Sequence, residues 1–223
     1  PNVTLDIAAA LPPLVFGYIR TTIEHAYEYC YVLRYTVGPV PHVFVLVASD
    51  YAGVFRTILT ALLEELMQDP AADLAPVLHD AVALSPTAAA LPTLCLGWLT
   101  VAAAPEQFVI DMIRSFTVEF FVDIVARLLR EERVVFFSQH IEQLLPIVQS
   151  FLFVLRPFVW QHILIPVLPF QLAPYLTSII PCVIGCTPGT FGHALIEFGS
   201  LEDVHVVDCK DFKDVGDCVA RNY

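Results

Sequence analysis

The feature that most constrains the fold of this chain is an uncharged tract interrupted by prolines. Residues 157–196 contain no Asp, Glu, Lys or Arg, but they contain six prolines. Each proline removes a backbone N–H donor, and its ring clashes with the carbonyl group of the preceding turn. Inside a bilayer no water replaces the lost hydrogen bonds, so a spanning helix interrupted this often is disfavoured. We therefore predict that the tract lies in the dry interior of a water-soluble domain, and a membrane-embedded protein is the competing interpretation.

A second apolar stretch is too short to cross a bilayer. Residues 93–104 are uncharged over twelve positions, whereas a spanning helix needs about twenty. The chain has a mean hydropathy of +0.69, and 57% of its 223 residues are hydrophobic. That is enough apolar material for the core of one large domain or of two small ones. We expect no transmembrane segment.

Four continuous apolar runs occur in the second half of the chain. Strands of a parallel sheet are covered on both faces, so they appear in sequence as continuous apolar runs rather than alternating ones. Helix-like or turn-rich segments separate the runs, and the clearest helical patterns are residues 108–132 and 141–155. This order predicts an α/β fold, a three-layer α/β/α module with a mostly parallel sheet. The predicted strands are residues 132–137, 162–167, 181–185 and 204–208.

A smaller module precedes the parallel one. Three strand candidates rich in aromatic and β-branched residues cover residues 14–20, 29–35 and 42–49. Apolar side chains at the i, i+3, i+4 spacing of an amphipathic helix follow, from Phe55 to Leu66. We predict an upstream strand–helix module over residues 14–67, a boundary region over 68–107, the larger α/β module over 108–210, and the start of a truncated downstream region over 211–223.

The charge of the chain limits its partners. It has 11 basic and 23 acidic residues, a net charge of −12. Basic side chains supply most of the affinity for nucleic acids and for anionic membrane surfaces, so we expect neither as a direct partner. The six cysteines lie mostly in apolar segments, which favours a reduced, cytoplasmic protein.

Motifs for covalent chemistry are missing from the sequence. It contains no G-x-S-x-G, H-E-x-x-H or G-x-x-x-x-G-K-[ST] pattern. The segment "GCTPGTFG" (185–192) lacks the G-x-G core of a nucleotide loop, so we interpret it as a surface turn, with an α/β nucleotide enzyme as a weaker alternative. We expect no cofactor and no covalent reaction.

Isolated histidines and cysteines do not form a convincing site in the sequence. A zinc site would need cysteines paired within loops, whereas Cys182 falls on a predicted buried strand, so no metal is expected. On an apolar strand, His162 is more often a core residue bonded to backbone than a general base. The cysteines and histidines considered as zinc ligands are Cys182, Cys186, His193, His205 and Cys209.

The central part of the chain resembles a known family. Residues 128–185 resemble the central part of a DENN domain, which typically shows a P-F-x-W-x-H-x-x-I-P-x-L-P tract, and the upstream segments resemble the longin-like module that precedes it. One departure is Lys210, close to a position where the family has a further acidic residue, and the family's downstream helical module is absent from this chain. The diagnostic residues, which we assign to the core, are Pro157, Trp160, His162, Pro166, Pro169 and Asp208.

This resemblance implies a guanine-nucleotide exchange factor for a Rab-family small GTPase in vesicle trafficking. A non-catalytic DENN-like scaffold that binds GTPases or trafficking regulators is the alternative. The resemblance also implies a protein that is cytoplasmic or peripheral on endomembranes, recruited through its partner or through missing domains. From their position in predicted loops, the expected partner-binding residues are Ser138, Gln139 and His140 after the first central strand, and Gly189, Thr190 and His193 after the strand at 181–185.

Overall fold

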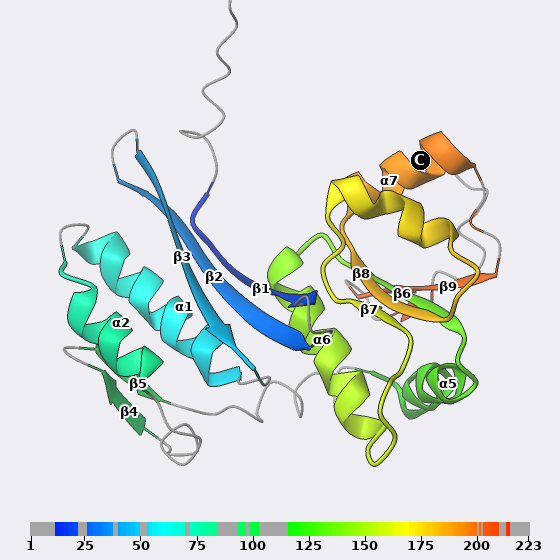
Figure 1. The fold of residues 1–223 in the computed structure, drawn as a ribbon, viewed down its shortest axis with the longest axis horizontal. Helices are drawn as coiled ribbons and strands as arrows, with labels where there is room; N and C mark the ends of the chain where they lie inside the picture. The colour runs from blue at the N-terminus through cyan, green and yellow to red at the C-terminus, as the bar shows by residue number, and fades with distance from the viewer. Residues whose placement is uncertain are drawn as a thin grey trace, which may run out of the picture. The chain divides into compact units, whose positions relative to one another are not determined.

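The chain divides into two compact units, residues 1–106 and residues 107–223 (Figure 1). None of the described helices is long and apolar enough to cross a bilayer. The computed structural model describes residues 12–21, 26–37, 40–49, 53–69, 72–83, 93–96, 99–102, 116–199, 201, 203–209 and 213–214.

The first unit is built on an antiparallel sheet with strand order β1-β2-β3. Tyr31 in the central strand lies opposite Gly17 of β1 and Leu46 of β3. Its ring contacts Phe55 of helix α1 at a centroid distance of 5.6 Å, which places α1 on this face of the sheet. The predicted strands and the predicted helix are confirmed. Their bounds are β1 (Leu14–Thr21), β2 (Tyr27–Val37), β3 (Val40–Ala48) and α1 (Gly53–Gln68).

The region 68–107, predicted as a boundary, contains further secondary structure of the first unit. Helix α2 (Ala75–Val82) buries Val77 and Ala81. The short apolar stretch at 93–104 contains an antiparallel hairpin of β4 (Thr93–Leu96) and β5 (Leu99–Ala102). The predicted domain limits themselves stay a prediction.

The second unit contains a mostly parallel five-stranded sheet with strand order β10-β9-β6-β8-β7. Strands β6, β7, β8 and β9 are parallel, and β10 pairs antiparallel to β9. The four predicted strands are confirmed at β6, β7, β8 and β9. The bounds are β6 (Arg133–Phe137), β7 (Ile163–Ile165), β8 (Cys182–Cys186), β9 (Val204–Asp208) and β10 (Lys213–Asp214).

Helices cover both faces of this parallel sheet. Val134 and Phe136 of β6 pack in one core layer with α5 and α6, whereas Val135 and Phe137 pack in a second layer with η2 and α7. This alternation confirms the predicted three-layer α/β/α fold. The covering helices are α5 (Val118–Leu129), α6 (Ile141–Val154), the 3-10 helix η2 (Phe170–Thr177) and α7 (Pro188–Phe198).

Two sequence predictions for the second unit need correction or restriction. The segment 185–192 is not a surface turn, because Gly185 and Cys186 complete β8, and Pro188 begins α7. Proline at the first helical position costs no hydrogen bond, since that N–H has no partner within the helix. The predicted helix at 108–132 is described only from residue 116 onward, and α5 covers Val118–Leu129.

Candidate functional site

The carboxyl ends of β6 and β8 form a topological switch point. The two strands are parallel neighbours, but the chain leaves β6 into α6 in one helical layer and leaves β8 into α7 in the other. In open α/β sheets, ligands bind where neighbouring connections diverge in this way. We define the carboxyl-edge site as residues 138–143 and 187–193.

Ser138 holds the turn between β6 and α6. Its backbone N–H donates to the Cys186 carbonyl oxygen at 3.1 Å, which joins the ends of β6 and β8. Its Oγ accepts from the His140 N–H at 3.0 Å and lies 3.4 Å from Gln143 Oε1. Ser138 is fully buried, so its side chain supports the turn from inside, and its predicted partner contact stays a prediction.

The two residues after Ser138 are accessible. Gln139 and His140 are both exposed. The His140 Nδ1 lies 3.3 Å from Glu142 Oε1, so a protonated imidazole forms an ion pair at the start of α6. These side chains have the accessibility that a partner contact requires.

The second predicted set lies at the start of helix α7 rather than in a loop. The hydroxyl oxygens of Thr187 and Thr190 are 3.4 Å apart, and Thr190 is buried, so its side chain supports the helix start. Gly189 is exposed, and a side chain added there would meet no atom within 4 Å.

His193 lies one turn further along α7. Its ring packs on Phe170 of η2 at a centroid distance of 4.1 Å. Its Nδ1 is 3.4 Å from Glu197 Oε2, close enough for an ion pair but without hydrogen-bond geometry. The half-buried His193 therefore joins the two covering elements of this face while part of its ring stays accessible.

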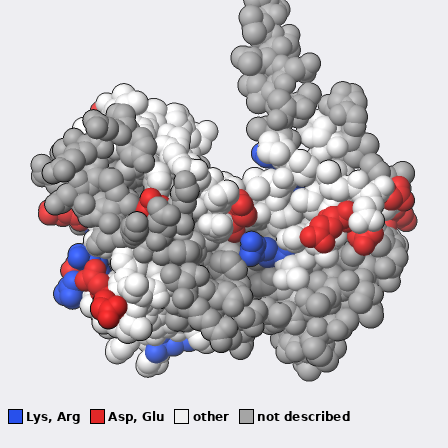
Figure 2. Space-filling model, turned by 180° about the vertical axis from the view of Figure 1, so that it is seen from behind, with Lys and Arg blue, Asp and Glu red and all other residues white. Residues whose placement is uncertain are grey.

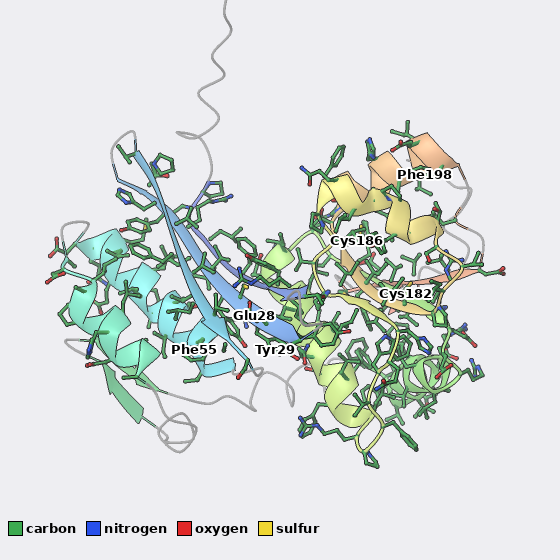
Figure 3. All side chains as sticks on the ribbon, viewed as in Figure 1. Glu28, Tyr29, Phe55, Cys182, Cys186 and Phe198 are labelled. Atoms are coloured by element: carbon green, nitrogen blue, oxygen red, sulfur yellow. The ribbon has the colours of Figure 1, made fainter. Side chains whose placement is uncertain are left out.

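The structure brings the two predicted sets to the same edge of the sheet. Gln139 and His140 follow the end of β6, and Gly189 and Thr190 follow the end of β8, whose last residues pair at Phe137 and Cys186. Figure 3 shows Cys186 at the end of β8 that leads into α7. His193 lies farther from the edge, over η2.

Pro166, one of the family-diagnostic residues, fixes the exit of β7. It is buried, and its carbonyl oxygen lies only 1.8 Å from the position that a Cβ on Gly185 would occupy. The Leu168 N–H donates to the Gly185 carbonyl oxygen at 2.8 Å. Glycine is therefore required at position 185 by close approach of two backbone segments.

Trp160 and His162 connect the tract before β7 to its surroundings. The indole N–H of Trp160 donates to the Ile163 carbonyl oxygen at 3.1 Å, and the Trp160 ring packs against the core layer of α5 and α6. The half-buried His162 has its Nε2 3.1 Å from Glu131 Oε2. The prediction that His162 bonds to backbone is thus replaced by a contact with a carboxylate.

The remaining diagnostic residues lie outside the core or at its edge. Pro157 is exposed just beyond α6, and Pro169 is exposed as the residue that precedes η2. The core assignment is wrong for these two, because both prolines mark turns at the ends of helices. Asp208 is half-buried at the end of β9.

The three thiols that the structure describes in the second unit, those of Cys182, Cys186 and Cys209, are protonated at neutral pH. Burial raises the pKa of Cys182 to about 11 and that of Cys186 to about 12, and it also raises the pKa of Cys209. Because the thiolate is the reactive form, these three cysteines are poor nucleophiles. Within the described residues, no group of three or more His, Cys, Asp and Glu side chains is arranged to hold a metal ion.

Sequence reasoning missed the exposed apolar side chains of η2 and α7. Phe170 and Tyr175 are exposed, although the uncharged tract that carries them is predicted to be interior, and Phe198, just beyond this tract, is also exposed. Figure 2 shows, on one face of the molecule, that the described charged side chains lie in small separate groups.

Comparison with known proteins assigns the family. The DENN (AEX-3) domain model matches residues 40–211. The DENN domain-containing protein 2A of Mus musculus and that of Homo sapiens are each 33% identical to this chain over 98 residues, which cover 44% of this chain and 10% of each relative. The chain thus spans about a tenth of the length of these curated relatives. Since the family model matches well over half of the sequence, the chain belongs to the DENN domain family.

Proposed function

We propose that this chain promotes GDP release from a Rab-family small GTPase in vesicle trafficking. The observation that carries the proposal is the DENN family match over residues 40–211, because DENN domains as a family act as Rab exchange factors. The match covers only 10% of the length of the relative. That this chain has the exchange activity of a whole DENN-domain protein is therefore itself proposed.

Nucleotide exchange needs binding energy rather than covalent chemistry. An exchange factor binds a GTPase conformation that holds nucleotide weakly, and the binding energy shifts the population toward that conformation. By linkage, nucleotide that rebinds weakens the affinity for the factor by the same ratio. A rigid surface of about 800 Å² on each partner is sufficient for such an interaction. The protonated, buried thiols of the second unit are compatible with this requirement.

The accessible part of the carboxyl-edge site is the proposed contact. Gln139, His140, Gly189 and His193 are reachable from solvent, and they are positioned by the buried Ser138 and Thr190. We propose that the GTPase contacts the four accessible residues directly. Ser138 and Thr190 contribute only by holding these residues in position. Residues 14–67 and 108–210 are the proposed longin-like and central DENN modules, and recruitment to endomembranes is proposed to occur through the partner.

The test is an exchange assay with Rab-family GTPases loaded with a fluorescent GDP analogue. We expect the 223-residue chain to accelerate release at least tenfold for one or more Rab proteins of a purified panel. The double variant His140→Ala/His193→Ala should lose most of this acceleration. His79→Ala on α2 is the control, because His79 is also an exposed histidine beside a carboxylate but lies in the other unit.

Two outcomes contradict parts of the proposal. Binding of a Rab protein without faster GDP release would favour the scaffold alternative. Full activity of the double variant would remove the two histidines from the contact and leave the exchange activity itself intact.

A further inference from the structure

The outer side of η2 and α7 does not pack against the sheet and exposes several apolar side chains. The two elements are joined by the contact of Phe170 with His193, and their inward side chains belong to the core layer around Val135 and Ile184. The outward ones are exposed, most of all Ile196 at 88%. Ile179, which is 91% exposed, and Ile180 lie in the segment directly after the end of η2 at Thr177. We call this the η2–α7 surface; its apolar members are Phe170, Leu172, Tyr175, Ile179, Ile180, Ile196 and Phe198.

This surface is held rigid from below. Ala173 and Leu176 of η2 are buried, and Arg133 Nη2 of β6 donates to the Leu176 carbonyl oxygen at 2.8 Å. The Ser178 N–H donates to the Tyr175 carbonyl oxygen at 3.2 Å, and the Ile180 N–H donates to Ser178 Oγ at 3.3 Å. A partner therefore loses little conformational entropy in ordering this surface, which favours affinity.

The composition of the η2–α7 surface is that of an interface centre. Interface centres are enriched in aromatic side chains and depleted in charged ones. The outer face of α5 in the opposite layer also exposes apolar residues, such as Val118 and Val122, but they are aliphatic. The charged pair Asp123 and Arg127 lies on the same helix. The observations therefore favour η2–α7 over α5 as a protein-binding surface.

The charge near this surface selects the kind of partner. Residues 157–209 contain no Lys or Arg, although Arg133 of β6 reaches the Leu176 carbonyl oxygen from below. Glu197 lies between Ile196 and Phe198 with about half of its side chain exposed, and its Oε2 is 3.4 Å from His193 Nδ1. With a net charge of −12, a second copy of the chain and an anionic membrane are both repelled. A protein with an apolar patch and a Lys or Arg at its rim is electrostatically complementary.

We infer that the η2–α7 surface docks the Rab-family GTPase through an apolar patch of that protein, with a basic side chain opposite Glu197. The inference rests on the proposed function and extends it, because the docking contact lies beyond the carboxyl-edge site. His193 belongs to both regions, because it lies on α7 and its ring contacts Phe170 of η2.

The experiment compares three aspartate substitutions in the full 223-residue chain. Ile179→Asp and Ile196→Asp each place a charge on the η2–α7 surface, and both positions are too exposed for the change to disturb the core. Val118→Asp is the matched control, since Val118 is 73% exposed on α5. Binding of GDP-loaded Rab proteins to the immobilised chain and their release of the fluorescent GDP analogue are measured for each variant.

We expect Ile179→Asp and Ile196→Asp each to lower the affinity and the exchange rate at least tenfold, while Val118→Asp changes them less than twofold. Glu197→Lys should slow association several-fold, with a smaller loss at high salt. If the wild-type chain is active and both isoleucine variants equal it, the inference is overturned while the proposed function stands. A wild-type chain that neither binds nor activates any Rab protein overturns both.

Two further measurements test whether a second copy of the chain or a membrane covers the η2–α7 surface instead. Light scattering after gel filtration would show a dimer that Ile179→Asp dissociates if a second copy covers the surface. Co-sedimentation with phosphatidylserine vesicles would show binding that Ile196→Asp abolishes if a membrane covers it. Either result overturns the inference.

Discussion

In the antiparallel sheet of the first unit, strand β3 exposes Val43, Val45 and Val47 on one face and turns Leu46 into the core. In the parallel sheet of the second unit, every residue of β8 from Cys182 to Cys186 is buried. The strands of an antiparallel sheet need a helix on one face only, whereas parallel strands are covered on both faces. In β3, the face of the sheet toward which a side chain points therefore decides whether that side chain is buried. In β8, side chains on both faces of the sheet are buried in a core layer.

The same contrast applies within the second unit, between its inner and outer helix faces. Phe151 of α6 is fully buried among Phe116, Phe121 and Phe136, with ring centroids between 5.1 and 5.5 Å away. Phe153, two residues later on the same helix, is 52% exposed. The following predictions test whether stability follows these burial differences, starting from the largest expected effect.

Phe151→Ala should destabilise the second unit most. Removal of a buried phenylalanine side chain costs about 3–5 kcal/mol of unfolding free energy, because transfer energy is lost and a cavity remains. Phe153→Ala is the matched control and should cost less than about 1 kcal/mol, since its ring is half exposed. Urea unfolding followed by Trp160 emission in a Trp98→Phe background reports on the second unit, because the chain has two tryptophans. Equal losses for the two variants would contradict the assignment of the core.

Gly185→Ala should be the next most disruptive change. The added Cβ would lie 1.8 Å from the Pro166 carbonyl oxygen, so β8 and the exit of β7 must separate, at an expected cost of about 3 kcal/mol. Gly189→Ala is the control, because open space surrounds that position and alanine favours a helix by up to about 1 kcal/mol. The urea midpoints of the two variants should shift in opposite directions. A stable Gly185→Ala variant would rule out the close backbone approach.

A single substitution made in both sheets compares them directly. Val135→Thr places a hydroxyl at a fully buried position of β6, which costs about 1–3 kcal/mol unless the hydroxyl finds a partner. Val45→Thr changes a side chain that is 45% exposed on β3, so it should alter stability by less than about 0.5 kcal/mol. Similar losses of unfolding free energy for the two variants would contradict the expected difference between the two sheets.

Alkaline pH should weaken the second unit through its buried thiols. Burial raises the pKa of Cys182 to about 11 and that of Cys186 to about 12, whereas a thiol in the unfolded chain titrates near pH 8.5. Above about pH 9 the folded state keeps protons that the unfolded state has lost, so the unfolding free energy falls by about 1.4 kcal/mol per pH unit for each thiol.

Urea unfolding at several pH values measures this slope. Between about pH 6 and pH 8 the thiols are protonated in both states, and their contribution to the slope should vanish. The double variant Cys182→Ala/Cys186→Ala should have a shallower alkaline slope than the parent. An unchanged slope would mean that other groups, such as the tyrosines, control the alkaline loss of stability.

Strands were predictable where burial is continuous. The runs that became β6, β8 and β9 are mostly apolar, with Arg133, His205 and Asp208 as their polar residues, and short runs of this kind are typical of strands covered on both faces. Helix α1 was predictable because Ile58, Leu59 and Leu62 recur at helical spacing and are buried. In these segments the local pattern and the final environment agree.

Helix α7 escaped prediction because apolar residues lie on both its buried and its exposed side. Phe191 and Ala194 are buried, whereas Ile196 and Phe198 are exposed, and all four are apolar. A hydropathy pattern shows a helix only when the outer face is polar, so an apolar outer face hides the period. The segment was therefore interpreted from its glycines and its proline as a turn.

The candidate site was predictable in part. Loop positions after apolar runs pointed to Gln139, His140 and Gly189, which are accessible at the carboxyl edge. The same reasoning could not tell that Ser138 and Thr190 are buried, because the burial of a loop residue depends on the elements that pack over it. Strand order cannot be read from the sequence either, since any order of four apolar runs satisfies the same hydropathy.

By itself, the sequence determined which segments form the strands of the parallel sheet, because short, continuous apolar runs separated by helical or turn-rich segments are typical of strands covered on both faces. It also determined the family resemblance, through residues such as Trp160 and Pro166. The tertiary structure alone decided that β6 and β8 are neighbours, that Gly185 lies against Pro166, and that part of the uncharged tract faces outward. The physical reason is that hydrophobic burial is non-directional, whereas pairing of strands and contact between helices depend on which surfaces fit together in space.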